Sequence, residues 1–202
     1  MIRRWTFAAL GALLLTLAAC SSTPQVQQYL LSAPELSAIS TSEPNASGAK
    51  IVIGQVEVAA FLSGQSIVTM QDGHQLHQAH YHRWAEPLPR QLQRQLRLGL
   101  AAQLPNHSWL SIHGSAHLRS LDYRLDIVVD EFHLNSRQQA VVGGQWQLRD
   151  ANQGYVAHGQ FHQYQGLSAD GYPALVEALN QAWQQSLVEI AEQLTHNGTL
   201  QL

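Results

Sequence analysis

The sequence predicts an α/β fold: a mixed, largely antiparallel sheet of about six strands packed against two long amphipathic helices in a single domain. Two stretches, 88–100 and 172–194, place apolar residues at every third or fourth position, which is the period of a helix with one buried face. Between 121 and 164 apolar and polar residues alternate, as in strands with one buried face. The length suits one such domain.

The first predicted strands are short and lead into a hairpin. The segment "QYLLSAP" predicts a strand centred on 29–31, and the Ser-, Pro- and Gly-containing segment 35–50 predicts a loop. Residues 50–58 carry apolar side chains at both odd and even positions, which predicts a central strand covered on both faces. Residues 66–84 form two extended pieces around Asp72-Gly73, a pair that favours a tight turn.

The first helix is predicted to begin near Glu86 or Pro87, because prolines are tolerated in a first turn and an acidic residue complements the helix dipole there. Pro105-Asn106 is predicted to end it. Leucines at every fourth position form its apolar stripe, and three arginines lie off that stripe. The leucines are Leu88, Leu92, Leu96 and Leu100, and the arginines are Arg90, Arg94 and Arg97.

A β-meander and a second helix complete the predicted domain. In 121–134 the apolar residues change from odd to even positions, so we expect a β-bulge at Asp130-Glu131 that keeps the apolar face inward. Residues 139–150 and 155–164 continue the alternation and predict two more antiparallel strands, with one face of the meander open to solvent. The second helix is predicted to have Asp170 as its N-cap, Pro173 in its first turn, and its end at Asn197-Gly198.

The N-terminus has the three parts of a secretory signal. Arg3 and Arg4 are basic, the run 5–17 is apolar but shorter than the ~20 residues of a membrane span, and small residues precede Cys20, the chain's one cysteine. The four residues Leu17-Ala18-Ala19-Cys20 resemble the bacterial lipobox, in which the cysteine is acylated and becomes the first mature residue. We therefore expect Cys20 to carry a lipid anchor.

These features define the expected organisation of the chain. We expect a signal peptide at 1–19, a lipidated flexible tether at 20–28 and the folded domain at 29–196. An aspartate directly after the acylated cysteine would resemble the signal for retention in the inner membrane. This chain has Ser21 at that position instead. This favours sorting to the periplasmic face of the outer membrane of a Gram-negative bacterium.

The charge balance excludes some classes of partner. Without residues 1–19 the Lys and Arg residues fall from eleven to nine against fourteen Asp and Glu, which gives a formal charge of about −5 at neutral pH. A negative chain is not expected to bind nucleic acid or the surface of an anionic membrane. Charged residues form only 12% of the chain, and glutamine supplies much of the polar surface.

The segment "YHRWAEPLPRQLQRQL" carries a resemblance to a known family. Together with "YLLSAP" and "IVIGQVEVAAFLSGQSIVTM" it resembles the PqiC-type ABC-transport auxiliary lipoproteins, over a region from Tyr29 to about Leu194. The resemblance implies an envelope role: an outer-membrane partner of an MCE-domain transport protein and its inner-membrane components, which move lipids between membranes and maintain envelope integrity. It implies no catalytic residues and no cofactor. Self-assembly into a homo-oligomer would suit such a role by analogy.

Other classes of function have weaker support. The chain has no Gly-x-Ser-x-Gly, His-Glu-x-x-His or phosphate-loop motif, so we expect no enzyme. A periplasmic lipid carrier would need an apolar cavity between sheet and helices. Zinc or copper binding is the alternative that a histidine cluster suggests, although solvated positions in a hairpin are the favoured interpretation, because only His80 and His82 would share a strand face. The cluster is His74, His77, His80 and His82.

The motif that precedes the first helix has two interpretations. In the favoured one, Trp84 buries its ring at the strand-to-helix junction and Glu86 complements the helix N-terminus, next to Pro87. In the other, Arg83 and Trp84 form a patch that contacts a partner, because these residue types are enriched in interface hot spots.

Overall fold

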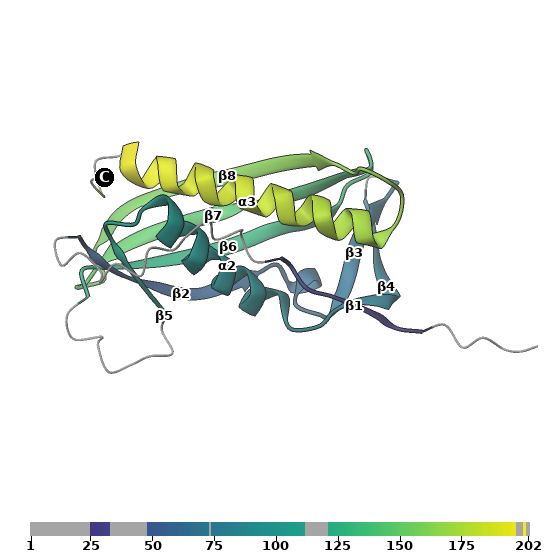
Figure 1. Cartoon of the computed structure of the whole chain (residues 1–202), viewed down its shortest axis with the longest axis horizontal. Helices are drawn as coiled ribbons and strands as arrows, with labels where there is room; N and C mark the ends of the chain where they lie inside the picture. Colours follow the sequence, from purple (N-terminus) through teal and green to yellow (C-terminus); the bar gives the residue numbers. More distant parts are fainter. Residues whose placement is uncertain (1–24, 33–47, 73, 112–120, 197–199, 201–202) are drawn as a thin grey trace, which may run out of the picture.

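The computed structural model describes residues 25–32, 48–72, 74–111, 121–196 and 200. In this part of the chain eight strands form one mixed sheet, and two long helices cover one of its faces (Figure 1). The strands are β1 (Gln27–Tyr29), β2 (Lys50–Val58), β3 (Ser66–Gln71), β4 (Gln75–Trp84), β5 (Ser108–Ser111), β6 (Tyr123–Leu134), β7 (Gln139–Asp150) and β8 (Tyr155–Gly166). The helices are α2 (Leu88–Gln103) and α3 (Tyr172–His196), and the short 3-10 helix η1 (Ala60–Leu62) joins β2 to β3. The predicted α/β class is confirmed.

Strand β6 organises the sheet. Along one side it pairs over its whole length with β7, which pairs in turn with β8, and both pairings are antiparallel. Along its other side β6 pairs in parallel with β2 and, at Leu134, with Thr69 of β3. The sheet then extends through the antiparallel β3–β4 hairpin to the parallel strand β1, and from β2 to the parallel strand β5. The sheet is therefore mixed, and its longest pairings are the antiparallel ones.

The predicted β-bulge lies in β6. The register with β7 shifts between Val129 and Glu131, which leaves Asp130 without a partner in the ladder. Val129 and Phe132 are both buried, although they are three residues apart. The extra residue therefore keeps the apolar face of β6 turned toward the helices, as the change of phase in the sequence predicted.

Helix α2 begins close to the predicted position and buries its leucine stripe. Pro87 is the N-cap residue, and Pro89 lies in the first turn, where no intrahelical N–H donor is needed. The helix ends at Gln103, and the N–H of Leu104 donates to the carbonyl of Leu100. The four leucines of the stripe have no exposed surface. This packing, rather than helix propensity, supplies most of the stability of such a helix.

Helix α3 differs from the prediction at its start. It begins at Tyr172, and the carbonyl of Gly171 accepts the bond from the N–H of Leu175 at 3.1 Å. Gly171, rather than Asp170, therefore takes the N-cap position. Its φ of 102° explains the correction, because a residue with a side chain rarely adopts that conformation. Pro173 lies in the first turn as predicted, whereas Asn197 and Gly198 lie outside the described residues.

The strands also differ from the predictions in detail. β1 begins at Gln27, so Gln27 and Gln28, which were expected in the tether, pair with β4. β5 was not predicted, and it raises the strand number to eight. The β3–β4 hairpin is confirmed, and Asp72 adopts a φ of 47° beside Gly73, which is not described. The expected signal peptide, Cys20 and most of the predicted loop at 35–50 also lie outside the described residues.

Large side chains fill the layer between sheet and helices. Trp146, Phe132 and Phe161 from the sheet and Trp183 from α3 are each at most 2% exposed. The rings of Phe161 and Trp183 meet edge to face with centroids 5.9 Å apart. Side chains of this size each contribute roughly 1.5–3 kcal/mol when buried. The described part of this layer is thus a packed core.

Candidate functional site

The junction between β4 and α2 is a structural corner. Trp84 is 3% exposed and meets the ring of Phe132 edge to face, with centroids 6.0 Å apart. The backbone N–H of Trp84 donates to the carbonyl of Gln65, and the backbone N–H of Ala85 donates to the carbonyl of Tyr29. The indole therefore belongs to the core and presents no surface to a partner. Arg83 is exposed beside it.

Glu86 lies one residue before the N-cap of α2. Its carboxylate forms an ion pair with Arg94, two turns into the helix, and its carbonyl accepts a bond from the side chain of Gln91. The carboxylate thus interacts with a side chain of the helix rather than with the N–H groups of its first turn. Both partners of the ion pair are partly exposed, so the pair contributes at most about 1 kcal/mol.

Two buried glutamines of α2 hold the chain that follows β1. The side-chain oxygen of Gln91 accepts from the N–H of Leu31 at 2.8 Å, and the amide of Gln95 donates to the carbonyl of Ser32 at 2.9 Å. Gln184 of α3 donates to Gln95 at 3.0 Å. Because a buried amide is costly unless it is hydrogen-bonded, these bonds fix the segment to α2 and link Gln95 of α2 to α3. We call Gln91, Gln95 and their partners Leu31, Ser32 and Gln184 the glutamine clamp.

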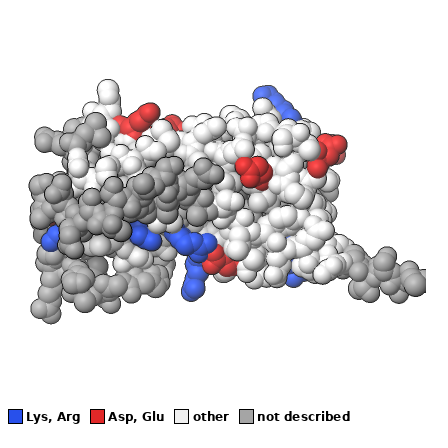
Figure 2. All heavy atoms as spheres, viewed as in Figure 1, with Lys and Arg blue, Asp and Glu red and all other residues white. Residues whose placement is uncertain are grey.

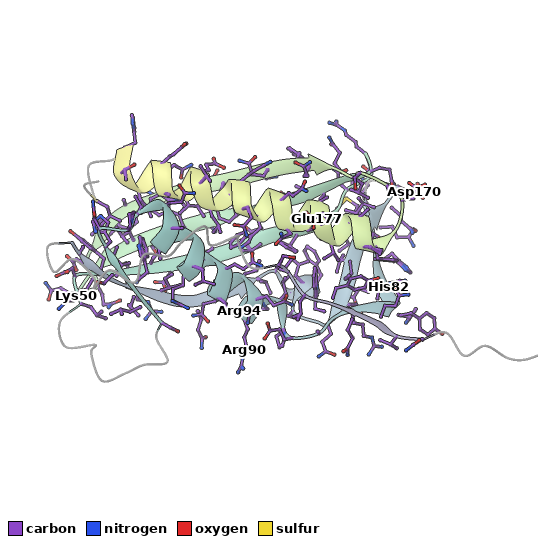
Figure 3. All side chains as sticks on the ribbon, viewed as in Figure 1. Lys50, His82, Arg90, Arg94, Asp170 and Glu177 are labelled. Carbon is purple, nitrogen blue, oxygen red and sulfur yellow. The ribbon has the colours of Figure 1, made fainter. Side chains whose placement is uncertain are left out.

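Three aromatic rings attach β1 to the start of α3. The hydroxyl of Tyr29 lies 2.9 Å from Nδ1 of His82, and His82 stacks on Tyr172 with centroids 3.9 Å apart. Burial raises the pKa of both tyrosines, and for Tyr29 the proximity of Tyr172 raises it further. Figure 3 shows His82 at the end of the molecule where α3 begins. His82 therefore joins β1, β4 and α3 as a packing residue.

Most of the other described histidines are exposed, whereas His133 of β6 is buried. His74, His77 and His80 are exposed along the β3–β4 hairpin. On the open face of the meander, His162 lies 2.5 Å from the carboxylate of Glu131. Among the residues that the structure describes, no three His, Cys, Asp or Glu side chains are grouped in a way that could hold a metal ion.

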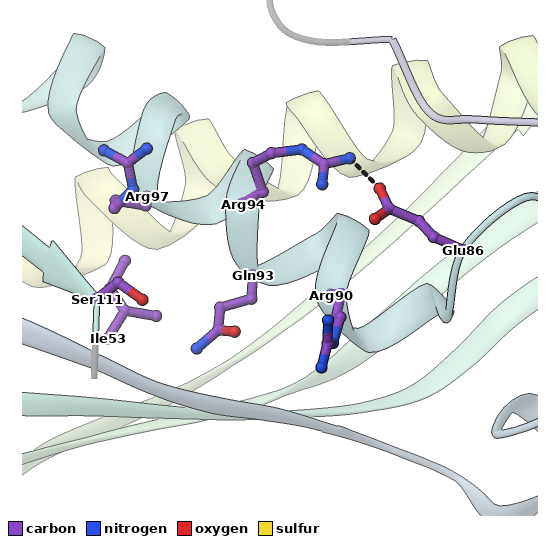
Figure 4. A pocket seen from close by; sticks show the side chains of 7 residues that line it. All are labelled: Ile53, Glu86, Arg90, Gln93, Arg94, Arg97 and Ser111. Atoms are coloured by element: carbon purple, nitrogen blue, oxygen red, sulfur yellow. Dashed lines mark hydrogen bonds and ion pairs between the residues drawn. The ribbon is translucent and has the colours of Figure 1, made fainter. Parts of the chain in front are cut away.

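A groove with a strongly basic wall runs along α2. It encloses about 390 Å³, and its lining residues are Ile53, Glu86, Arg90, Gln93, Arg94, Arg97 and Ser111 (Figure 4). The three arginines occupy positions i, i+4 and i+7 of α2 and so share one side of the helix. Gln93 donates to the carbonyl of Gly54 at 2.7 Å and fixes α2 over β2. We call this the arginine groove.

The arginine groove concentrates positive charge in a chain of negative net charge. Among the described residues, three arginines line it, and Glu86 is its one acidic lining residue. Figure 2 shows basic side chains gathered on the part of this face below α2, with an acidic side chain at one end. The sequence placed the arginines off the leucine stripe, but it gave no reason to expect a cavity beside them.

A second groove lies on the open face of the meander. It encloses about 420 Å³ between β6, β7 and β8, and Asp130, Glu131 and His162 are among its lining residues. Gly143 makes room for the ring of His162, because a Cβ there would lie 2.5 Å from that ring. Its charges are opposite in sign to those of the arginine groove.

The described helices are too short or too polar to cross a membrane. The model of the ABC-type transport auxiliary lipoprotein component matches residues 29–191. The chain therefore belongs to the family of ABC-type transport auxiliary lipoproteins. Among curated proteins, none matches the chain.

Two solved structures share the fold of this chain. The crystal structure of an uncharacterized protein superposes with a TM-score of 0.69 at 28% identity, over 84% of this chain and 99% of the other. A protein from Xanthomonas campestris superposes with a TM-score of 0.68 at 20% identity, over 86% of this chain and 97% of the other. The chain is thus an envelope lipoprotein that serves as an auxiliary component of ABC-type transport.

Proposed function

We propose that this chain is an outer-membrane lipoprotein that docks an ABC/MCE-type lipid transport system at the outer membrane through contacts with an MCE-domain protein. The family match over residues 29–191 is the observation that carries the proposal. In this proposal the chain has no catalytic role and takes no cofactor. Its contribution is a folded surface held within a limited distance of the membrane.

The anchor and the position of β1 set that distance. In the proposal Cys20 is acylated and lies at the outer membrane, and β1 begins at Gln27. A fully extended chain spans at most ~3.3–3.6 Å per residue, so seven residues reach no further than roughly 25 Å. The glutamine clamp fixes the chain immediately after β1, so the domain would follow the anchor closely. A partner that crosses the periplasm would meet the domain near the membrane.

The outer edge of β8 is the proposed contact surface for a partner or for a second copy of the chain. Within the described residues β8 pairs with no strand other than β7, so its other side is open to an added strand, although the carbonyl of Gln160 accepts a bond from Gln193 of α3 at 2.9 Å. Tyr155 and Tyr164 are 58% and 54% exposed on this strand. Tyrosine is enriched in interfaces, and an open edge can pair with an added strand.

The packed core argues against the carrier alternative. A lipid carrier needs an apolar cavity, whereas Trp146 and Trp183 fill the centre of the described layer. The two grooves described above lie on the surface and have charged linings. Contact with partner proteins therefore has more support than enclosure of a lipid.

Complementation of a deletion strain tests the proposal. We expect the wild-type chain to restore resistance to detergent and bile salts, and Cys20→Ala to fail although the protein is exported and folded. Cys20→Ser, in place of Cys20→Ala, gives a second unanchored variant with a polar side chain of similar size. Full restoration by both unanchored variants would contradict the proposed role of the anchor.

A further inference from the structure

The three arginines of the arginine groove repel one another, and the described lining residues of the groove compensate this repulsion only in part. Like charges at i, i+4 and i, i+3 of a helix repel each other, and Arg90, Arg94 and Arg97 combine both spacings. Glu86 neutralises one of them, Arg94. Among the described residues, the side chains of Arg90 and Arg97 have no hydrogen-bond or ion-pair partner.

The geometry favours a ligand with several acceptor oxygens. Arg90 and Arg97 are seven residues apart, so their Cα atoms are separated by roughly 10 Å along the helix axis. Each guanidinium offers a planar fork of donors that matches phosphate in a bidentate contact. Figure 4 shows that Arg94 extends toward Glu86, whereas Arg90 and Arg97 project from α2 elsewhere along the groove. Ile53 adds an apolar side chain to the lining of the groove, and Ser111 adds a polar one.

We propose that the arginine groove binds a phosphate group, as a monoester or a diester, through Arg90 and Arg97, with Arg94 recruited when it exchanges Glu86 for the ligand. The volume of about 390 Å³ lies within the range of small-molecule sites, so the groove can hold the phosphate together with the group it esterifies. Glu86 then acts as a competitor that occupies one of the three arginines in the free protein.

The negative net charge is consistent with this proposal. The net charge of a protein governs its attraction to an extended anionic surface. A small ligand in a groove instead interacts mainly with the charges that line the groove, because salt screens the more distant ones. The acidic residues of the second groove lie on the open face of the meander, away from α2. The inference goes beyond the proposed function, because it names a ligand class for a site that docking does not require.

Titration of the full-length chain in an uncharged, phosphate-free detergent tests the proposal. The probes are inorganic phosphate and glycerophosphoglycerol, the phosphodiester head group of phosphatidylglycerol without its acyl chains, with glycerol as the uncharged control and chloride at matched ionic strength. Calorimetry gives the dissociation constants. We expect saturable binding of at least one phosphate probe and none of glycerol.

Three variants separate the groove from general charge effects. Arg90→Gln/Arg97→Gln should weaken binding at least about ten-fold, because each removes a charge-assisted contact. Glu86→Gln should tighten binding about two- to five-fold, because it frees Arg94. Arg137→Gln removes one positive charge from the exposed turn before β7, outside the groove, and should change binding less than about two-fold.

The outcomes are distinguishable from those for the proposed function. Tighter binding of the diester assigns the groove to a lipid head group, and tighter binding of inorganic phosphate assigns it to a free anion; both support the proposal. Binding of neither probe, or equal weakening by Arg137→Gln, overturns it. If neither probe binds and Arg90→Gln/Arg97→Gln instead abolishes crosslinking to a protein in the envelope, the groove recognises an acidic protein and the phosphate proposal is wrong.

Discussion

The two halves of this domain are held together in different ways. The meander β6–β7–β8 and α3 are joined by two long antiparallel pairings and by apolar side chains such as Phe161 and Trp183. The half formed by β1, β4 and α2 shares the apolar core through Trp84 and the leucine stripe of α2. Within it, however, β1 and the residues that follow are held by a three-residue parallel pairing and by polar side chains, chiefly Gln91 and Gln95. The first half is a scaffold, and the second carries the attachment of the tether and the arginine groove.

This difference has an energetic consequence. The stabilisation from apolar burial grows with the buried area and supports the whole domain. A buried hydrogen bond contributes only about 1 kcal/mol, and its loss is costly when one partner is left buried and unsatisfied. Substitutions that remove buried apolar side chains of the scaffold should therefore unfold the domain. Damage to the glutamine clamp should release β1 while most of the domain remains folded.

The largest effect is expected in the scaffold. Trp183→Ala should lower the free energy of unfolding by about 3–5 kcal/mol, because it opens a large cavity between α3 and the sheet. Val188→Ala, at a 39% exposed position on the same helix, should change it by less than about 0.5 kcal/mol. Urea denaturation measures both. Similar losses for the two variants would show that the layer is not the packed core described here.

Two adjacent glycines of β7 give a smaller effect within the scaffold. A Cβ at position 144 would lie 2.1 Å from the backbone carbonyl oxygen of Val128, so Gly144→Ala should cost about 1–3 kcal/mol. At position 143 the Cβ would instead meet the side chains of His162 and Glu131, which are 42% and 41% exposed and can move. Gly143→Ala should therefore cost less. Thermal unfolding compares the two variants, and the reverse order would refute this account of the bulged region.

The glutamine clamp tests the second half. Gln95→Ala removes the partners of Ser32 and Gln184 and should cost about 1–3 kcal/mol. Hydrogen exchange should rise first in β1 and in Leu31, before the meander is affected. Gln181→Ala, at an exposed position of α3, is the matched control and should leave exchange unchanged. Uniform faster exchange in both halves of Gln95→Ala would mean that the halves do not differ as described.

The smallest effect concerns pH. Burial raises the pKa of Tyr29 in the folded state, so the neutral phenol stabilises the fold below about pH 10 and this contribution is lost as the pH rises through the folded pKa. Wild type should therefore lose stability relative to Tyr29→Phe as the pH rises above about 10. The difference between wild type and Tyr164→Phe, at an exposed position, should change less over the same range. Chemical denaturation across this range measures both differences, and parallel curves for wild type and Tyr29→Phe would contradict the prediction.

The sequence predicted the elements that have a local apolar period better than the features that depend on distant parts of the chain, for a physical reason. Alternation and helical spacing report local burial, so the β-bulge at Asp130 and the leucine stripe of α2 were predicted from the residues alone. β5 has four residues, and it pairs with a strand more than fifty residues earlier, so no local period identifies it. The N-cap of α3 was misplaced because the φ of Gly171 depends on how the chain leaves β8.

The candidate site was predicted only in part. The burial of Trp84 agrees with the favoured interpretation of its motif, but the ion pair of Glu86 with Arg94 was not expected. The glutamine clamp was missed, although a helical wheel places Gln91 and Gln95 beside the leucine stripe, where an uncharged amide can be buried. Their partners in the segment after β1 are about sixty residues away, so the bonds follow only from the tertiary fold.

The central claim is that the chain works as a tethered partner of a transport system. Brief crosslinking of the full-length lipoprotein in its own envelope, followed by pull-down, tests it most directly, with Cys20→Ala as the unanchored control. The account predicts recovery of an MCE-domain protein with the wild-type chain and its loss or weakening with Cys20→Ala. Recovery of only the chain itself and bound lipid from intact membranes would contradict the claim and would favour a lipid carrier.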